Sequence, residues 1–407
     1  MERLSMNFCK PFVCLLLLGG CASLGLKSQV PKGPLRVSNL ATFSLTGRTE
    51  VSFQPLETKD WQWRGRNALG AGPQSFVAPI LLGGDDALLV TLGGGVGLYD
   101  LRSGKPRWFN SIPVGVGCIP QISSSQLYVA GMDGVVRRMD LRTGKLKWET
   151  KLSAESLGGV ALGSGFVYVT TADDALWALD EKTGQVQWSY KRPAPKGSLF
   201  WSLRGTSTPL LSPDAMKLFV GFSDGVFVAL EAVSGQTVWE RNFERSGRFK
   251  DADQRGVMSS SGDLIYLPLV DGDLLALKTS DGSTLWSIAD AGAATPLLDE
   301  AASLLYVVTN QGHLQKHSLV DTKLLWSTAV DKALVSSPVK VGAGYLAMTT
   351  SQKGLVFVDA SVGTVVEQRN MGPGILAPPA FDGRRLLIIS SRNRLLMYRV
   401  DLRAPKA

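Results

Sequence analysis

Short apolar runs recur along most of the chain, and turn-forming residues separate them at regular distances. One such run, 176–179, predicts a β-strand, and the segment from Asp180 to Gly184 after it predicts a tight turn. An Asp at the start of such a turn accepts local backbone N–H groups, and a Gly near its end takes the left-handed conformation without penalty. A second short strand then leads to Trp188. The pattern therefore predicts paired antiparallel strands rather than helices.

The same pattern returns in successive copies. The copies begin at Gly94, Asp133, Asp173, Asp224, Asp271, Gln311 and Lys353, and an eighth begins at Asn393. A further hairpin precedes each copy, as at 126–130, which makes four strands per copy. The Trp residues that end six of the copies lie 40, 40, 51, 47 and 40 residues apart. This spacing is typical of β-propeller blades, and a large Trp in each predicts a wedge between neighbouring sheets.

The predicted fold class is therefore all-β: an eight-bladed β-propeller of four-stranded antiparallel blades, with the last blade closed by an N-terminal strand. The eighth copy lacks a last strand, and the segment from Asp60 to Arg64, with its two Trp residues, is the expected donor. A strand in that place would close the ring and leave no open edge. A solenoid of the same repeat is the alternative, but it would need capping ends, and none is evident.

The first residues predict an export signal rather than part of the fold. A charged start with Arg3 and Lys10 precedes the apolar run 11–18, which is too short to span a bilayer as a helix. The ending Leu18-Gly19-Gly20-Cys21 resembles the lipobox of bacterial lipoproteins. In that family the peptide is cut before the cysteine, whose acyl chains then anchor the protein. The resemblance implies lipidation of Cys21, and a plain signal peptide with an incidental cysteine is the alternative.

The predicted organisation is a lipoprotein signal peptide at 1–20, a lipidated flexible tether at 21–58 and the propeller at 59–403. The tether segment is rich in Ser, Thr, Gly, Lys and Pro and shows no sustained periodicity. Ala22 follows the cysteine at a position where inner-membrane retention in enterobacteria favours Asp. The expected destination is therefore the outer membrane.

Charge and cysteine content narrow the function classes. The formal net charge is +8, but the basic residues are scattered along the copies rather than clustered, so nucleic acid is not an expected partner. Once 1–20 is removed, only Cys21 and Cys118 remain of the four cysteines, too few for a disulfide framework. Cys118 is predicted to be a small buried hydrophobic residue.

The unit Ala-Leu-Asp-x-x-Thr-Gly-x-x-x-Trp at 178–188 resembles the repeats shared by pyrroloquinoline quinone (PQQ) dehydrogenases and their non-enzymatic relatives. Enzymes of that family hold the quinone and a calcium ion centrally, and many carry an adjacent Cys-Cys pair or a Cys-x-x-Cys-His haem motif. This sequence has neither motif. His313 and His317 would share one strand face, but further metal ligands are not evident, so a solvated or blade-packing role is expected. We expect no cofactor, no metal and no enzymatic activity, and a PQQ-dependent dehydrogenase is the weaker alternative.

The two widest Trp intervals indicate extra residues after Trp188 and after Trp239. The second insertion, 243–256, is strongly charged. The first, 191–205, brings large apolar side chains beside an arginine: Leu199, Phe200, Trp201, Leu203 and Arg204. Aromatic residues beside an Arg are the usual composition of a binding anchor. The alternative is that these apolar residues fold back onto the propeller.

The lipobox, the short tether and an eight-bladed propeller of this length together resemble the BamB family, lipoprotein subunits of the complex that inserts β-barrel proteins into the bacterial outer membrane. Its members carry Leu-Ser-Leu-Arg-Gly and then Ser-x-Pro, and this sequence has Trp201-Ser-Leu-Arg-Gly205 and then Thr-Ser-Thr-Pro209. In the family this stretch contacts a POTRA domain of the insertase subunit BamA. The resemblance implies contacts by Leu203 and Arg204, with Trp201 in place of a Leu. A second family contact uses two acidic residues one apart, which implies Asp251 and Asp253.

The resemblance also implies a cellular role. It implies a non-enzymatic scaffold, anchored by its lipid to the outer membrane and facing the periplasm, that assists insertion of outer-membrane proteins. The implied partners are a BamA-type insertase and unfolded outer-membrane protein clients. A PQQ-repeat lipoprotein that scaffolds another envelope complex is the alternative.

Overall fold

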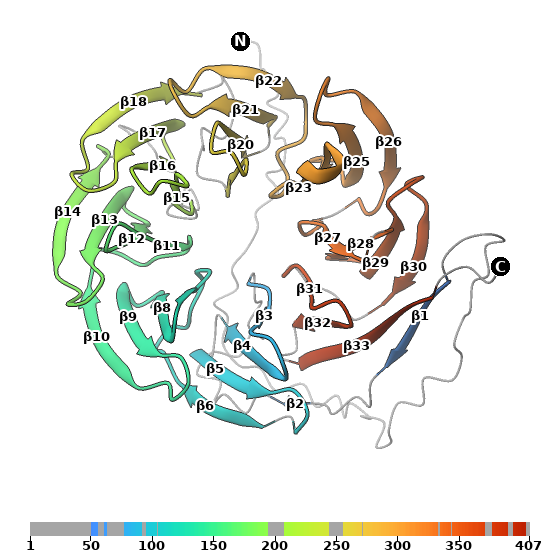
Figure 1. The fold of residues 1–407 in the computed structure, drawn as a ribbon, viewed down its shortest axis with the longest axis horizontal. Helices are drawn as coiled ribbons and strands as arrows, with labels where there is room; N and C mark the ends of the chain where they lie inside the picture. The colour runs from blue at the N-terminus through green and yellow to red at the C-terminus, as the bar shows by residue number, and fades with distance from the viewer. Residues whose placement is uncertain are drawn as a thin grey trace, which may run out of the picture. The chain divides into compact units, whose positions relative to one another are not determined.

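The computed structural model describes residues 50–55, 61–62, 77–91, 95–103, 105–193, 207–243, 255–270, 272–332, 334–342, 344–370, 377–389 and 394–403. The chain divides into two compact units, Met1–Leu40 and Ala41–Ala407, and every described residue belongs to the second. This second unit consists of eight antiparallel sheets set side by side around a ring (Figure 1). The predicted all-β, eight-bladed propeller of four-stranded blades is confirmed.

The first four blades follow one another in sequence order. Blade 1 comprises β3 (Ile80–Leu81), β4 (Asp86–Thr91), β5 (Gly95–Asp100) and β6 (Pro106–Asn110). Blade 2 comprises β7 (Gln121–Ser123), β8 (Gln126–Ala130), β9 (Val135–Asp140) and β10 (Leu146–Lys151). Blade 3 comprises β11 (Val160–Gly163), β12 (Phe166–Thr171), β13 (Ala175–Asp180) and β14 (Val186–Lys191). Blade 4 comprises β15 (Leu210–Leu211), β16 (Lys217–Gly221), β17 (Val226–Glu231) and β18 (Thr237–Asn242).

The other four blades repeat this arrangement. Blade 5 comprises β19 (Val257–Met258), β20 (Leu264–Pro268), β21 (Leu274–Lys278) and β22 (Thr284–Ile288). Blade 6 comprises β23 (Leu297–Asp299), the 3-10 helix η1 (Glu300–Ala302), β24 (Leu304–Val308), β25 (His313–Ser318) and β26 (Leu324–Ala329). Blade 7 comprises β27 (Val339–Val341), β28 (Tyr345–Thr350), β29 (Gly354–Asp359) and β30 (Val365–Arg369). Blade 8 contains β31 (Ala380–Phe381), β32 (Arg385–Ile389) and β33 (Arg394–Arg403).

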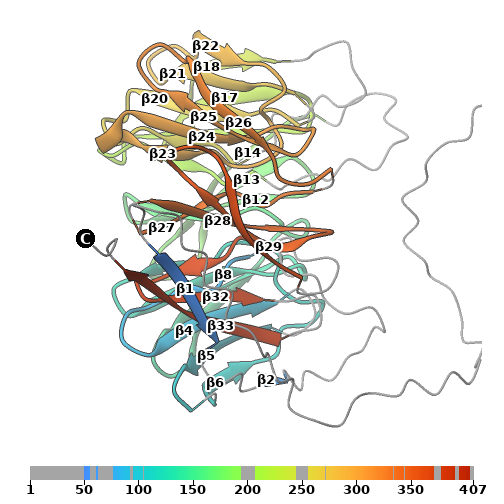
Figure 2. The ribbon, with the colours of Figure 1, turned by 90° about the vertical axis from the view of Figure 1, so that its right-hand side faces the viewer.

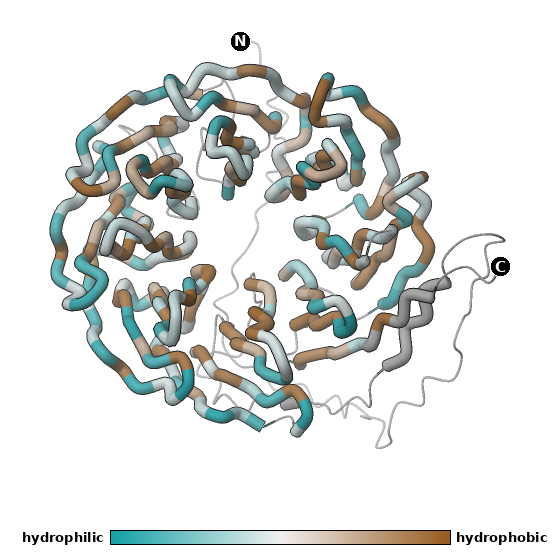
Figure 3. Tube along the Cα trace, in the orientation of Figure 1, coloured by the Kyte–Doolittle hydropathy of each residue, from teal (hydrophilic) through white to brown (hydrophobic). Residues whose placement is uncertain are grey.

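Each blade runs outward from the centre of the ring. Its first strand lies innermost and its last strand forms the rim, as β11 and β14 do in blade 3 (Figure 1). Figure 2 shows the same blades from the side. Hydrophilic positions are frequent along rim strands such as β10 and β14 (Figure 3). Within the described ranges, no helix has the length and hydropathy needed to cross a bilayer.

A β-bulge recurs between the third and fourth strands of the first seven blades, next to the position that is Trp in the first six of them and Glu367 in the seventh. In blade 3 the register pairs Ala178 with Trp188 but Leu179 with Val186, so Gln187 is the extra residue. A bulge bends its strand and increases the local twist, which re-aims the adjacent side chain. The bulge explains why the Trp can leave its own sheet and reach the next blade.

The repeated Asp, Gly and Trp meet at the boundary between blades. The Trp148 indole of blade 2 lies on Gly184 of blade 3, and its Nε1–H donates to the carbonyl of Glu181 at 3.1 Å. Gly184 has φ +76, and a Cβ there would lie 2.6 Å from the indole ring. The turn therefore needs Gly for two reasons, its left-handed backbone and the aromatic ring against it. The predicted Trp wedge and left-handed turn Gly are both confirmed.

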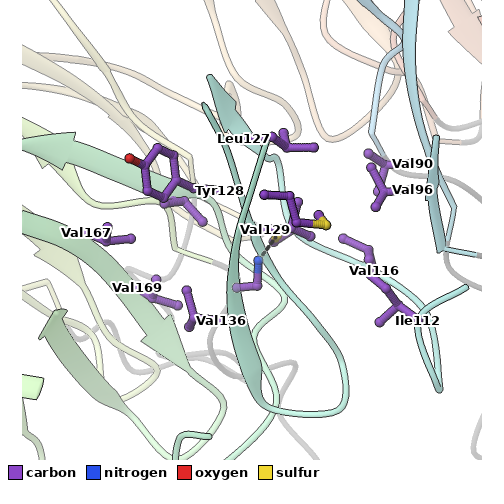
Figure 4. Packing of buried hydrophobic residues seen from close by; sticks show 14 of the residues in the cluster. Val90, Val96, Ile112, Val116, Leu127, Tyr128, Val129, Val136, Val167 and Val169 are labelled. Carbon is purple, nitrogen blue, oxygen red and sulfur yellow. Dashed lines mark hydrogen bonds between the residues drawn. The ribbon is translucent and has the colours of Figure 1, made fainter. Parts of the chain in front are cut away.

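The hydrophobic core is divided into clusters that join neighbouring blades. One cluster joins blades 1 to 3, with Val90 and Val96 on one side and Val167 and Val169 on the other (Figure 4). Another joins the last blade to the first, where Leu387 packs in one cluster with Leu89. Burial of apolar surface stabilises a fold by about 25 cal/mol per Å² removed from water. Because such clusters span each boundary between neighbouring blades, side-chain packing stabilises the whole ring.

Two N-terminal strands pair with β33: β1 (Glu50–Pro55) and β2 (Trp61–Gln62). β2 lies in the segment predicted to donate a strand, and β1 lies in the segment predicted as the tether. Closure of the last blade by an N-terminal strand stays a prediction, as do the boundaries 1–20, 21–58 and 59–403.

Candidate functional site

The sequence placed the partner-binding residues on the two longest connections between blades. Most of both connections lies outside the described residues, namely 194–206 of the first and 244–254 of the second, and so does Cys21. All the predicted contact residues fall in these two ranges: Trp201, Leu203, Arg204, Asp251 and Asp253. What the structure describes is the base from which both connections leave and to which they return, on blades 3, 4 and 5.

The first connection starts from a partly buried ion cluster across the boundary of blades 3 and 4. Arg192, just after β14, donates from Nε to Oδ2 of Asp224 at 2.8 Å, and its Nη1 lies 3.1 Å from Oε1 of Glu240. The Arg192 side chain is 16% exposed, which limits screening by solvent. Burial lowers the pKa of Arg192, but its hydrogen bonds to Tyr190 and Asp224 and the Asp224 charge outweigh it, so this pKa is raised. The Arg192 guanidinium therefore stays charged at neutral pH.

A second contact ties the same boundary together. Asp174 is buried, and its carboxylate accepts hydrogen bonds from the backbone N–H and the hydroxyl of Ser223 in blade 4. Its own carbonyl accepts the N–H of Arg192 at 3.0 Å. Asp174 has φ +56, at a position where other copies of the repeat have Gly, as at Gly134 and Gly225. The left-handed region is uncommon for a residue other than Gly, although Asp tolerates it better than most.

Two further ends of the connections are also fixed. Ser207, where the first connection returns, accepts the N–H of Gly221 on its Oγ and the hydroxyl of Thr170 on its carbonyl, at 3.3 and 2.6 Å. Phe243, where the second connection departs, donates its N–H to the carbonyl of Gly225 at 2.8 Å. Its side chain packs against the core shared by blades 4 and 5. Both connections are thus held to blade 4.

The other candidate groups have structural roles. Cys118 is fully buried, its Sγ accepts the N–H of Ala130, and burial raises the pKa of its thiol to about 12, which confirms the predicted small hydrophobic residue. His317 is buried in blade 6 and bonds the carbonyl of Thr322 and the side chain of Gln315 through its two ring nitrogens. The predicted packing role is confirmed for His317. The described part of the chain holds no group of three or more metal-ligating side chains.

Neither contact at the boundary of blades 3 and 4 was predicted from the sequence, although one signal pointed to the Asp174–Ser223 contact. Asp173-Asp174 stands where other copies have Asp-Gly, as at Asp133-Gly134. An acidic residue that replaces a turn Gly must adopt a left-handed backbone conformation that is less favourable for it. Here the carboxylate of Asp174 accepts a hydrogen bond from Ser223 of the neighbouring blade. The partner of Asp174, Ser223, lies 49 residues away, the partner of Arg192, Asp224, lies 32 residues away, and neither pairing follows a local pattern.

Most of the described ring is similar in sequence to a known protein family. A family model described as "Outer membrane protein assembly factor BamB" matches residues 92–267 and 248–404. Two curated relatives with that description come from Legionella pneumophila (strain Paris) and Moranella endobia (strain PCIT). Each is 24% identical, over 198 and 200 residues, or 47% and 48% of this chain. The matched part spans 50% of the length of each relative.

Solved structures share the fold. BamB from Moraxella catarrhalis aligns with a TM-score of 0.70 at 19% identity, over 85% of this chain and 99% of that one. Quinohemoprotein alcohol dehydrogenase from Comamonas testosteroni aligns with a TM-score of 0.66 at 13% identity, over 83% of this chain and 75% of that one. At these identities the likeness shows a common propeller architecture, which hosts several unrelated functions.

Proposed function

The chain belongs to the family of outer membrane protein assembly factor BamB, and from that membership we propose that it is a non-enzymatic scaffold of the complex that assembles β-barrel proteins in the outer membrane. The observation that carries the proposal is the family match, which extends over nearly all of the propeller. The dehydrogenases share the fold at 12–13% identity, and this sequence lacks the paired cysteines and the haem motif that mark many of them. The enzyme alternative therefore has only the fold in its favour.

The proposed partner is the POTRA region of a BamA-type insertase. Trp201, Leu203 and Arg204 would supply an apolar anchor with a charged neighbour, and Asp251 and Asp253 a second, acidic contact. Support for placing both contacts together comes from the base of the two connections, since blade 4 holds an end of each. Unfolded outer-membrane proteins are proposed as transient clients. A scaffold for a different envelope complex is the second candidate, because the repeat alone serves many roles.

The proposed location is the periplasmic side of the outer membrane, with the lipid on Cys21 as the anchor. Two or three acyl chains on one residue give stable anchoring, whereas a single chain gives only reversible binding. A Cys21→Ser variant is expected to lose incorporation of labelled palmitate and to leave the membrane fraction. Palmitate labelling that persists in this variant would exclude Cys21 as the acylated residue.

Co-purification with the insertase tests the partner. Tagged wild type should retain the BamA-type subunit, and the double variant Leu203→Ala/Arg204→Glu should lose it, because central anchor residues each contribute about 2 kcal/mol or more. Arg142→Glu is the matched control, since it reverses an exposed charge in the β9–β10 turn of blade 2. Retention by the double variant would reject the contact residues. No retention by the wild type would reject the partner.

A further inference from the structure

The turn between β16 and β17, residues 222–225, is where the two long connections are tied to one blade. Asp224 of this turn binds Arg192 at the start of the first connection, at 2.8 Å. Gly225 of the same turn accepts the N–H of Phe243 at the start of the second, also at 2.8 Å. A displacement of this turn would therefore move the departure points of both connections together.

Arg192 is the one side chain of this cluster that crosses from blade 3. Its Nε and Nη1 reach Asp224 and Glu240, which belong to the second turn and the rim strand of blade 4. The side chains of Arg192 and Asp224 are 16% and 17% exposed, so the pair is largely shielded from water. Tyr190 adds a contact to the guanidinium and stacks on Phe222 with ring centroids 5.7 Å apart. A planar guanidinium can satisfy two acids at fixed angles, which an ammonium group cannot do.

The residue immediately before it offers a natural comparison. Lys191 pairs with Asp173 at 2.7 Å, but both residues belong to blade 3, and their side chains are 59% and 27% exposed. The two neighbouring cations thus differ in the blade to which their carboxylate partners belong. Lys191 ties blade 3 to itself, whereas Arg192 ties the base of the first connection to blade 4.

We propose that Arg192 is a positioning residue for partner binding: through Asp224 and Glu240 it fixes where the first connection leaves blade 3 relative to blade 4. This inference rests on the proposed function. Binding is weakened when a contact segment must be ordered at the moment of association, so a base that is already fixed raises affinity without itself touching the partner. Ser223 and Asp174 hold the same boundary and limit how far the base can shift.

The test measures affinity of the purified mature lipoprotein in detergent for the POTRA region of the insertase. Arg192→Met should weaken binding by about 5- to 30-fold, mainly through faster dissociation, as expected when preorganisation is lost. Lys191→Met, the matched control, should change it by less than about 2-fold, as usual for an exposed ion pair. Arg192→Lys keeps one charge and should restore part of the loss. Glu240→Gln is a milder variant in case Arg192→Met lowers the yield of folded protein.

A second measurement separates positioning from general stability. Hydrogen exchange in the segment 194–206 should accelerate in Arg192→Met but not in Lys191→Met, while exchange in the blade strands stays the same in both. Equal affinities of Arg192→Met and wild type, or equal losses in the two Met variants, would overturn the inference. If Leu203→Ala/Arg204→Glu weakens binding and Arg192→Met does not, only the inference fails. If the wild type does not bind, the proposed function fails and takes the inference with it.

Discussion

The hydroxyl of Tyr168 donates a hydrogen bond to the backbone carbonyl of Ala232 at 2.9 Å, across the boundary of blades 3 and 4. At four other boundaries the carbonyl in this position accepts the indole N–H of the wedge: Trp108 to Leu141, Trp148 to Glu181, Trp239 to Thr279 and Trp326 to Ala360. At the boundary of blades 3 and 4, the Tyr168 hydroxyl donates to this carbonyl in place of the Trp indole. The buried Nε1 of Trp188 is left without a partner among the described residues.

Substitution of Tyr168 by Phe should therefore change stability by no more than about 0.5 kcal/mol, because Trp188 can donate to the carbonyl that is freed and so offset the lost bond. Tyr128→Phe is the matched comparison. The Tyr128 hydroxyl donates to the Glu181 carboxylate at 2.7 Å, and loss of a bond to a charged group should cost about 1.5 kcal/mol or more. Thermal unfolding followed by circular dichroism compares the stabilities of the two variants. Equal losses of stability would contradict the replacement of the Tyr168 hydroxyl by the Trp188 indole as donor.

Gly184→Ala should destabilise more than Gly165→Ala, although both positions lie in blade 3 with nearly equal φ angles, +76 and +79. A left-handed Ala costs about 1–2 kcal/mol at either site. At Gly184 the added methyl also meets the Trp148 ring, which adds about 1–3 kcal/mol of overpacking, whereas nothing lies within 4 Å at Gly165. Urea unfolding midpoints measure the difference. Similar midpoints for the two variants would mean that the indole moves aside at little cost.

The turn carboxylates should make the protein acid-sensitive. Hydrogen bonds from the side chain and backbone of Thr143 lower the pKa of Asp140, and those from the backbone and side chain of Thr183 lower the pKa of Asp180. A lowered folded-state pKa stabilises above the unfolded value of about 3.9, and that stability is lost as the pH falls through the folded value. Melting temperatures should therefore hardly change above about pH 5 and fall below about pH 4.

The double variant Asp140→Asn/Asp180→Asn provides the control for this acid sensitivity. An amide oxygen still accepts the turn N–H groups but has no proton to gain. The melting temperature of the double variant should fall less steeply than that of the wild type between pH 4 and pH 2. An identical fall in both proteins would assign the acid sensitivity to other carboxylates.

Cys118 should be unreactive while the protein is folded. In a soluble form that begins at Ala22 it is the only cysteine, and burial raises the pKa of its thiol to about 12. At pH 8 a thiol reagent should therefore label it only after unfolding, since the thiolate is the reactive species. Labelling of native protein at the rate measured in urea would show that the strand carrying Ala130 opens readily.

The repeat alone was sufficient to predict the propeller. Asp180, Gly184 and Trp188 define one unit of turn and strand, the Trp spacing indicates the size of a blade, and the eight copies indicate the number of blades. These features are local, because a turn depends on backbone conformations that neighbouring residues set. The same spacing located both insertions, although their contact residues lie outside the described ranges and stay predictions.

The sequence by itself determined the fold class, the blade count and the two breaks in spacing where a partner is proposed to bind. Only the tertiary structure decided which side chains meet between blades: Arg192 with Asp224, Asp174 with Ser223, and Tyr168 in place of Trp188 at one carbonyl. The physical reason is distance along the chain. The repeat encodes contacts within a blade, whereas the boundary contacts join residues 32 to 64 positions apart, and the choice among competing donors there depends on geometry that no local pattern records.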